Sequence, residues 1–283
     1  MSMTVSLALL ALGAVVQQTD TTFAVPAGAR LQVQNHAGSI RVTAWDRPGM
    51  RVRADHGSRD QVNVEIRGSV VRIDAHRRYG MPAFVEYEIS VPSGMALDLN
   101  GVETEIVVVG PIGDVSAQSV EGGITVRRAT GSVTVGSIEG DLLLEAIRGR
   151  VKASATDGDV VLRDMTGDVL VETVDGDVTL ENIEATNVDV GTVDGTVTYR
   201  GVIHDGGRYR LTSHDGDVIL AVPPGLNATV RVATFDGSFE ADPAFRVQIT
   251  EARPGRRFSF TLGNGSAQVE LESFDGSIRL QRR

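Results

Sequence analysis

Acidic residues followed directly by glycine recur through the second half of the sequence, and their carboxylates could bind a metal ion or act as acids and bases. Eight such pairs are present: Glu121-Gly122, Glu139-Gly140, Asp157-Gly158, Asp175-Gly176, Asp194-Gly195, Asp215-Gly216, Asp236-Gly237 and Asp275-Gly276. Seven of the eight have Ser or Thr two residues before the acid, and Ala155 is the exception. Such a constant phrase indicates that the carboxylates occupy equivalent places in successive repeats.

Calcium binding is the chemistry that such a column would support. In a stack of parallel strands, neighbouring acids would lie about 4.8 Å apart, where they repel each other. A Ca²⁺ ion would relieve this repulsion, since it prefers oxygen ligands. The candidate ligands are Glu139, Asp157, Asp175 and Asp194. Alternatively, Asp and Gly are simply the residues that a tight turn favours, with the carboxylate accepting a backbone N–H bond, and the sequence favours this interpretation.

Catalytic chemistry has less support in the sequence. The chain contains no cysteine, which excludes disulfides, thiolate zinc sites and thiol catalysis. Its five histidines are scattered and form neither a Ser-His-Asp order nor a metal-binding pair. The alternative of an enzyme that cleaves polysaccharides requires carboxylates and arginines in a groove, which we would seek first around Arg148, Arg150 and Arg163. We predict a protein that is not an enzyme and has no cofactor.

A glycine that returns every nine residues organises the middle of the chain. The series is Gly113, Gly122, Gly131, Gly140, Gly149, Gly158, Gly167 and Gly176. The acid precedes every second glycine, so the structural period is eighteen residues. A short fixed period of strand and turn residues is typical of a solenoid. We therefore predict an all-β fold, a parallel two-sheet β-solenoid with about 18 residues per coil.

The alternation within each repeat predicts which side chains face the core. Predicted to point outward are Thr125, Thr134, Lys152 and Thr179, and the apolar Leu143, Val161 and Leu170 break the rule. Predicted to point inward are Val115, Ile124, Val126, Val133, Val135, Leu142, Leu144, Val151, Val160, Leu162, Val169, Val171, Val178, Leu180, Val188, Val190 and Val197. Beyond Gly195 the spacing lengthens and aromatic residues appear, which predicts wider coils, a closing C-terminal sheet and a core filled by Phe side chains.

Residues 21–110 consist of short alternating stretches separated by turn residues. This pattern predicts an antiparallel sheet with one wet face, which would cap the first coil of the solenoid. Trp45 is the only tryptophan. It could serve as a binding platform, but a single aromatic on an alternating strand favours packing within the cap.

We interpret the first residues of the chain as a targeting signal. The run from Val5 to Val16 is apolar and too short to span a bilayer, but it suits a secretory signal. The alternative is a buried first strand or helix, because Met1 to Thr4 contains no Lys or Arg. The predicted organisation is a signal peptide at 1–20, a cap at 21–110 and a solenoid at 111–283, with no transmembrane helix in the mature chain.

The charge of the chain excludes one class of partner. The net charge is −10, and residues 111–200 hold 16 acidic and 7 basic side chains. A phosphate backbone would be repelled by this surface, so we predict that the protein does not bind nucleic acid.

The repeated phrases resemble a known bacterial family, the "putative adhesin" domain of unknown function. The resemblance rests on Val91-Pro92-Ser93-Gly94, on Ser119 to Val126 with its successors, and on Ser273 to Ile278. It covers roughly residues 22–281. It implies an exported β-solenoid of the cell envelope, and it implies no catalytic residues. From the long regular solenoid without a recognisable site, we predict a surface for adhesion or interaction with a protein or glycan of the cell envelope, in the periplasm, at the cell surface or outside the cell.

Overall fold

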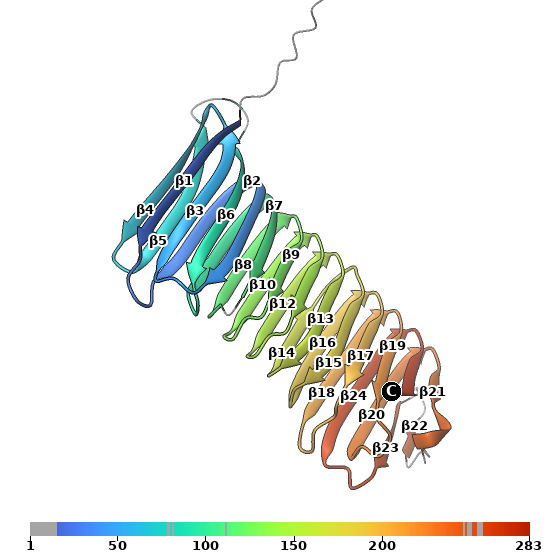
Figure 1. The fold of residues 1–283 in the computed structure, drawn as a ribbon. Coiled ribbons are helices and arrows are strands. Elements are labelled where there is room, and N and C mark those ends of the chain that lie inside the picture. Colours follow the sequence, from blue (N-terminus) through green and yellow to red (C-terminus); the bar gives the residue numbers. More distant parts are fainter. Residues whose placement is uncertain are drawn as a thin grey trace, which may run out of the picture.

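The computed structural model describes residues 16–77, 80, 82–110, 112–245, 247, 251–253 and 257–283. Within these residues the chain is all-β apart from one short 3-10 helix, η1 (Pro243–Phe245). The strands stack into an elongated solenoid that runs from an N-terminal block to a C-terminal closing sheet (Figure 1). The predicted fold class is confirmed. No helix in the described part of the chain is long and apolar enough to cross a membrane.

The N-terminal block combines antiparallel and parallel pairing. It contains β1 (Val16–Ala24), β2 (Arg30–Trp45), β3 (Gly49–Gly57), β4 (Asp60–Arg67), β5 (Val70–Arg77) and β6 (Phe84–Pro92). The predicted antiparallel arrangement is confirmed for β1–β3–β6 and for β4–β5. It is wrong for β2, which runs parallel to β5, β6 and β7 (Ala96–Val109). The reason is that β2 already belongs to the solenoid, whose successive coils run in one direction.

The predicted signal peptide and the predicted packing of Trp45 both concern this block. Residues 1–15 lie outside the described residues, and with them most of the predicted signal. Residues 16–20 belong to β1 and pair with β3. Trp45 is half-buried at the end of β2, where its Nε1 donates to the carbonyl of Gly49 at 2.8 Å. The guanidinium of Arg47 lies over its ring, 5.1 Å from the centroid.

The regular coils form two stacks of parallel strands. One stack contains β8 (Val115–Glu121), β10 (Val133–Glu139), β12 (Val151–Asp157), β14 (Val169–Glu172), β16 (Asn187–Asp194) and β18 (Arg208–Asp215), and the other β9 (Ile124–Arg127), β11 (Leu142–Glu145), β13 (Val160–Thr166), β15 (Val178–Glu184), β17 (Val197–Gly201) and β19 (Val218–Val222). Val133 pairs with Val151, and Leu142 pairs with Val160. Each coil thus advances by the eighteen residues that the glycine spacing predicts.

The glycine after each acid is required by the closeness of the coils. Gly158 has φ of +145°, and a Cβ atom there would lie 2.6 Å from the carbonyl oxygen of Gly140 in the preceding coil. Both the backbone conformation and the lack of space therefore exclude other residues. The sequence period is the consequence of this stacking.

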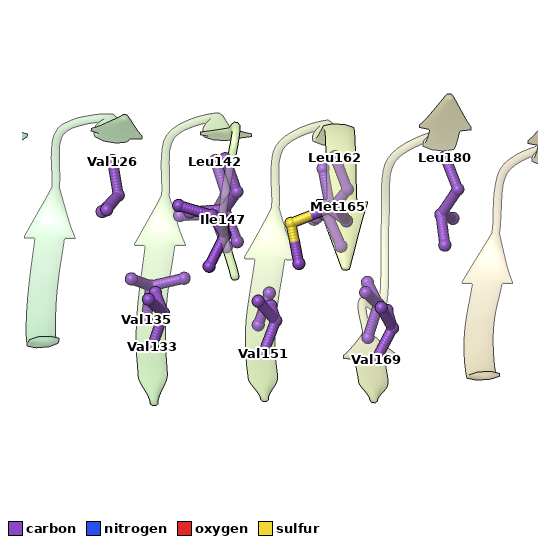
Figure 2. Close-up of a cluster of buried hydrophobic side chains, with 14 of the residues drawn as sticks. Val126, Val133, Val135, Leu142, Ile147, Val151, Leu162, Met165, Val169 and Leu180 are labelled. Atoms are coloured by element: carbon purple, nitrogen blue, oxygen red, sulfur yellow. The ribbon is translucent and has the colours of Figure 1, made fainter. Parts of the chain in front are cut away.

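The core lies between the two stacks, and every residue predicted to face inward is buried. Figure 2 shows Val133, Val135 and Val151 on one side, facing Leu142 and Leu162 on the other. A third set of core residues, which the alternation does not predict, lies at the corner after the second stack: Ile147, Met165 and Ile183. Each follows a residue in the left-handed conformation, namely Ala146, Asp164 and Asn182, which turns the next side chain inward.

The last coils do not stack in chain order. They contain β20 (Ala228–Asp236), β21 (Phe239–Ala241), β22 (Glu251–Arg253), β23 (Arg257–Leu262), β24 (Ala267–Asp275) and β25 (Ile278–Arg282). Strand β24 lies between β18 and β20, and β25 lies between β19 and β21. The antiparallel strands β23 and β22 then extend the outer edge of β20 and form the predicted closing sheet.

The prediction that Phe side chains fill the C-terminal core is partly wrong. Phe245 and Phe260 are buried, and Phe239 packs against Phe258 and Phe260. Phe235 and Phe274, however, stay exposed. Their position in the coil explains the difference, because both immediately precede an acid-glycine pair and so lie on the outside of the turn.

Candidate functional site

The four candidate metal ligands lie in one column, as predicted. Glu139 pairs with Asp157, which pairs with Asp175, which pairs with Asp194. All four side chains are exposed, and none of them takes part in an ion pair among the described residues. In that part of the chain, no three acidic or histidine side chains come together as ligands for a metal. The stacking is thus confirmed, and calcium binding stays the alternative hypothesis for this column.

A second set of acids stabilises the turns. Asp141, Asp159 and Asp177 follow the glycine, and each accepts a bond from a backbone N–H of the next coil. The N–H donors belong to Asp159, Asp177 and Thr196, at 3.0, 2.9 and 2.7 Å respectively. The predicted bond between a turn carboxylate and the backbone therefore exists, but it is made by the acid after the glycine. The carboxylate before the glycine remains available to solvent.

The Ser and Thr residues of the repeated phrase have a structural role. Ser137, Ser213 and Ser273 are buried, and their hydroxyls donate to the carbonyl of a glycine in the adjacent coil, at 3.1, 2.8 and 2.8 Å. The hydroxyl of Thr173 is buried and has no hydrogen-bond partner among the described residues. The hydroxyls of Ser137, Ser213 and Ser273 thus join the coils on the inside of the turn whose outer side carries the acids.

Between the buried hydroxyl and the acid, each coil exposes one further side chain. This apolar column consists, in spatial order, of Val102, Val120, Ile138, Thr156, Val174, Val193, His214, Phe274 and Phe235. Most members are large and apolar, yet Ile138 is 51% exposed and Phe235 is 68% exposed. Single exposed apolar residues are ordinary, whereas this column is apolar at every position except Thr156 and His214.

The neighbouring acids form the acidic column: Glu103, Glu121, Glu139, Asp157, Asp175, Asp194, Asp215, Asp275 and Asp236. We call the two columns together the turn ridge. With neighbouring strands about 4.8 Å apart, the ridge is about 38 Å long. Its two columns are one residue apart along the chain.

The ridge ends in stacked rings. The centroids of Phe235 and Phe274 are 4.8 Å apart with the rings 4° from parallel. His214 continues the stack, with its centroid 4.7 Å from that of Phe274. These three residues come from β20, β24 and β18 and meet only because the last coils are interleaved.

Shallow clefts follow the apolar column on the outer face of the first stack. One has a volume of about 350 Å³ and lies between the small residues Gly136 and Ser154 and the apolar Val120 and Ile138. Another, of about 150 Å³, is lined by Phe235, Phe274, Arg257 and Glu272. The apolar column is therefore bordered by hollows on one side and by the carboxylates of the acidic column on the other.

The arginines proposed for a polysaccharide-cleaving site do not gather in a groove. Arg148 and Arg150 lie exposed on the corner between β11 and β12, and Arg163 lies on the outer face of β13. Arg163 bonds Glu181 at 3.0 Å, and Arg200 bonds the same carboxylate at 2.9 Å. Hydrogen bonds from Arg163 and then from Arg200 lower the pKa of Glu181. The charges of Arg163, Glu181 and Arg200 are thus paired with each other, whereas Glu139, Asp157 and Asp175 form no ion pair among the described residues.

These features define the class of the protein: a parallel β-solenoid of stacked two-strand coils with one exposed apolar and acidic edge. Residues 28–281 match the family described as Toastrack DUF4097, and the chain belongs to this family. The resemblance seen in the sequence is thereby confirmed.

Two solved structures are similar to the chain. A putative adhesin from Bacteroides fragilis shares 10% identity over 93% of this chain and 96% of that chain, with a TM-score of 0.45. A putative cell adhesion protein from Clostridium sporogenes shares 10% identity over 94% of this chain and 100% of that chain, with a TM-score of 0.26. The search of curated proteins gives no match.

Proposed function

We propose that the protein is a non-enzymatic scaffold of the cell envelope that presents the turn ridge to a partner for adhesion. The observation that carries this proposal is the apolar column, which keeps Ile138, Val174 and Phe235 exposed along a rigid edge. Contact with a partner would remove this apolar area from water, which is the main favourable term in association.

The rest of the molecule supports a scaffold. The core is continuous from the N-terminal block to the last coil, and the regular pairing of successive coils spaces the side chains of the ridge evenly. Export, which the predicted signal and the resemblance both suggest, would place this edge where envelope partners are present.

Binding to envelope fractions of the producing cell tests the proposal. The full chain is compared with a ridge variant, Ile138→Ser with Val174→Ser and Phe235→Ser. A matched control, Leu143→Ser with Val161→Ser and Ile219→Ser, changes half-buried apolar residues on the outer face of the second stack. Binding by the wild type and the control, with at least a tenfold loss in the ridge variant, is expected.

Two results would count against the proposal. If the wild-type protein does not bind any envelope fraction, the adhesive role is wrong. If the ridge and control variants bind equally well, adhesion uses another surface. Thermal melts of all three proteins establish that the comparison is made between folded chains.

A further inference from the structure

We infer that the partner of the turn ridge is an extended polypeptide segment in which basic and apolar residues alternate. This inference rests on the proposed function and names the chemistry of the partner. The two columns of the ridge differ in chemistry, because one row of side chains is apolar and the adjacent row is acidic.

The electrostatics of the ridge select a cation. Glu139, Asp157 and Asp175 repeat along the axis without basic neighbours in ion-pair contact among the described residues. Two arginines of the nearby coils are instead paired on the second stack, Arg127 with Glu145 and Arg163 with Glu181, each at 3.0 Å. An anionic glycan or a lipid surface of negative charge would be repelled by the ridge, whereas a chain carrying Lys or Arg would be attracted.

The shape of the ridge selects an extended chain. In a β-conformation, successive side chains point to opposite sides. A segment lying along the apolar column therefore directs every second side chain toward the carboxylates. The remaining side chains face the hollow beside Val120 and Ile138, where Gly136 and Ser154 leave space for small apolar groups. The alternation of basic and apolar residues follows from this geometry.

The spacing of the ridge determines how specific the recognition is. Side chains on one side of an extended chain are about 6.8 Å apart, and the coils are about 4.8 Å apart. Because the spacing of the peptide side chains differs from the spacing of the coils, no fixed pairing of residues forms along the ridge. Binding thus depends on the pattern and length of the segment rather than on an exact sequence.

Fluorescence anisotropy with defined peptides tests this inference on the full chain. The probe is a labelled twelve-residue peptide of alternating Arg and Val, which spans about 40 Å when extended. Comparison peptides are the six-residue version, a block peptide with all Arg before all Val, and an alternating Glu and Val peptide. The expected order of affinity is alternating twelve-mer, then block peptide, then six-mer, with no binding of the Glu peptide. Raising the salt from 0.1 to 0.5 M shortens the reach of the charges and is expected to weaken binding at least tenfold.

Two pairs of variants locate the binding site. Asp157→Asn with Asp175→Asn removes two charges from the acidic column, and Asp164→Asn with Glu184→Gln removes two exposed charges from the opposite corner. The first pair is expected to weaken binding of the twelve-mer at least fivefold and the second less than twofold. Ile138→Ser with Val174→Ser is expected to weaken it at least fivefold, with Leu143→Ser and Val161→Ser as its control.

Several outcomes overturn the inference. These are the absence of saturable peptide binding, equal binding of the Glu peptide, and equal effects of the ridge and control pairs. If ridge variants lose binding to envelope fractions while the peptide does not bind, the proposed function stands and the partner chemistry is wrong. A soluble envelope glycan that binds at the ridge in place of the peptide would assign the surface to carbohydrate.

Discussion

The ring of Phe274 lies parallel to that of Phe235 at 4.8 Å, although 39 residues separate the two in the chain. They meet because β24 pairs with β18 on one side and with β20 on the other. The C-terminal strands therefore occupy the penultimate coil of the solenoid, and the coil that precedes them in sequence closes the end. This interleaving completes the turn ridge with its aromatic end.

The interleaving predicts that the terminal strands hold the preceding coil in place. Deleting residues 267–283 removes β24 and β25. In the described structure β24 pairs with one edge of β20, and β25 pairs with β21. We expect fast hydrogen exchange in β20 and β21 of this variant, with protection retained across 115–194. Deletion of residues 281–283 alone, which are exposed, is the control. Continued protection of β20 after the longer deletion would show that β23 alone holds it.

The buried hydroxyl column predicts a stabilising substitution. Ala155 occupies the place of Ser137 one coil later, and Ser137 donates to Gly122 O at 3.1 Å. The variant Ala155→Ser should form the equivalent bond and raise the free energy of unfolding by about 1 kcal/mol. Ser137→Ala should lower it by about as much. Thr173→Val is expected to cost nothing, because the Thr173 hydroxyl has no partner. Urea unfolding measures all three, and a destabilised Ala155→Ser would contradict the account.

The hairpin of β4 and β5 predicts a dependence of stability on pH. Asp60 is buried and accepts two bonds from Arg77, at 2.5 and 2.9 Å, which hold the pKa of Asp60 below its usual value. Because the pKa is lowered in the folded state, this contribution is present above about pH 4, the usual unfolded value, and is lost as pH falls through the folded pKa.

The variant Asp60→Asn should therefore lower the stability of the N-terminal block at pH 7 by about 1.5–3 kcal/mol, and the difference from wild type should shrink as the pH falls below about 4. Glu65→Gln removes an exposed partner of Arg67 in the same hairpin and should change stability by less than about 0.5 kcal/mol. Chemical denaturation at pH 7 and pH 3 gives both values. A difference that persists unchanged at pH 3 would be inconsistent with this origin.

The acidic column predicts the response to calcium. Its carboxylates stand in one row and do not converge as a ligand cluster in the described residues, so we expect the same Tm in millimolar calcium and in chelator at equal ionic strength. Asp157→Asn with Asp175→Asn removes repulsion between stacked acids and should raise the Tm by about 1–3 °C at low salt. A rise in Tm of several degrees in calcium, lost in this double variant, would show that the acidic column binds the metal.

Much of this structure could be predicted from the sequence, since the spacing of Gly140, Gly158 and Gly176 fixes both the coil length and the alternation of the strands. The same alternation places Ile138 outward beside the buried Ser137, so the apolar column had a signal in the sequence that the acid-glycine phrase obscured. The order of the last coils had no such signal in the sequence. Asp236 and Asp275 belong to two copies of the same acid-glycine phrase. Their order along the solenoid depends only on whether β24 or β20 pairs with the edge of β18.

Photo-crosslinking in the producing cells tests the central claim, that the turn ridge is the surface that contacts a partner. A benzophenone amino acid is placed at Val174 on the ridge, at Ile138 on the ridge, or at Val161 on the outer face of the second stack. The account predicts crosslinked adducts from positions 174 and 138 and none from position 161. Adducts from position 161 alone, or from none of the three positions in cells whose envelope fractions bind the protein, would contradict it.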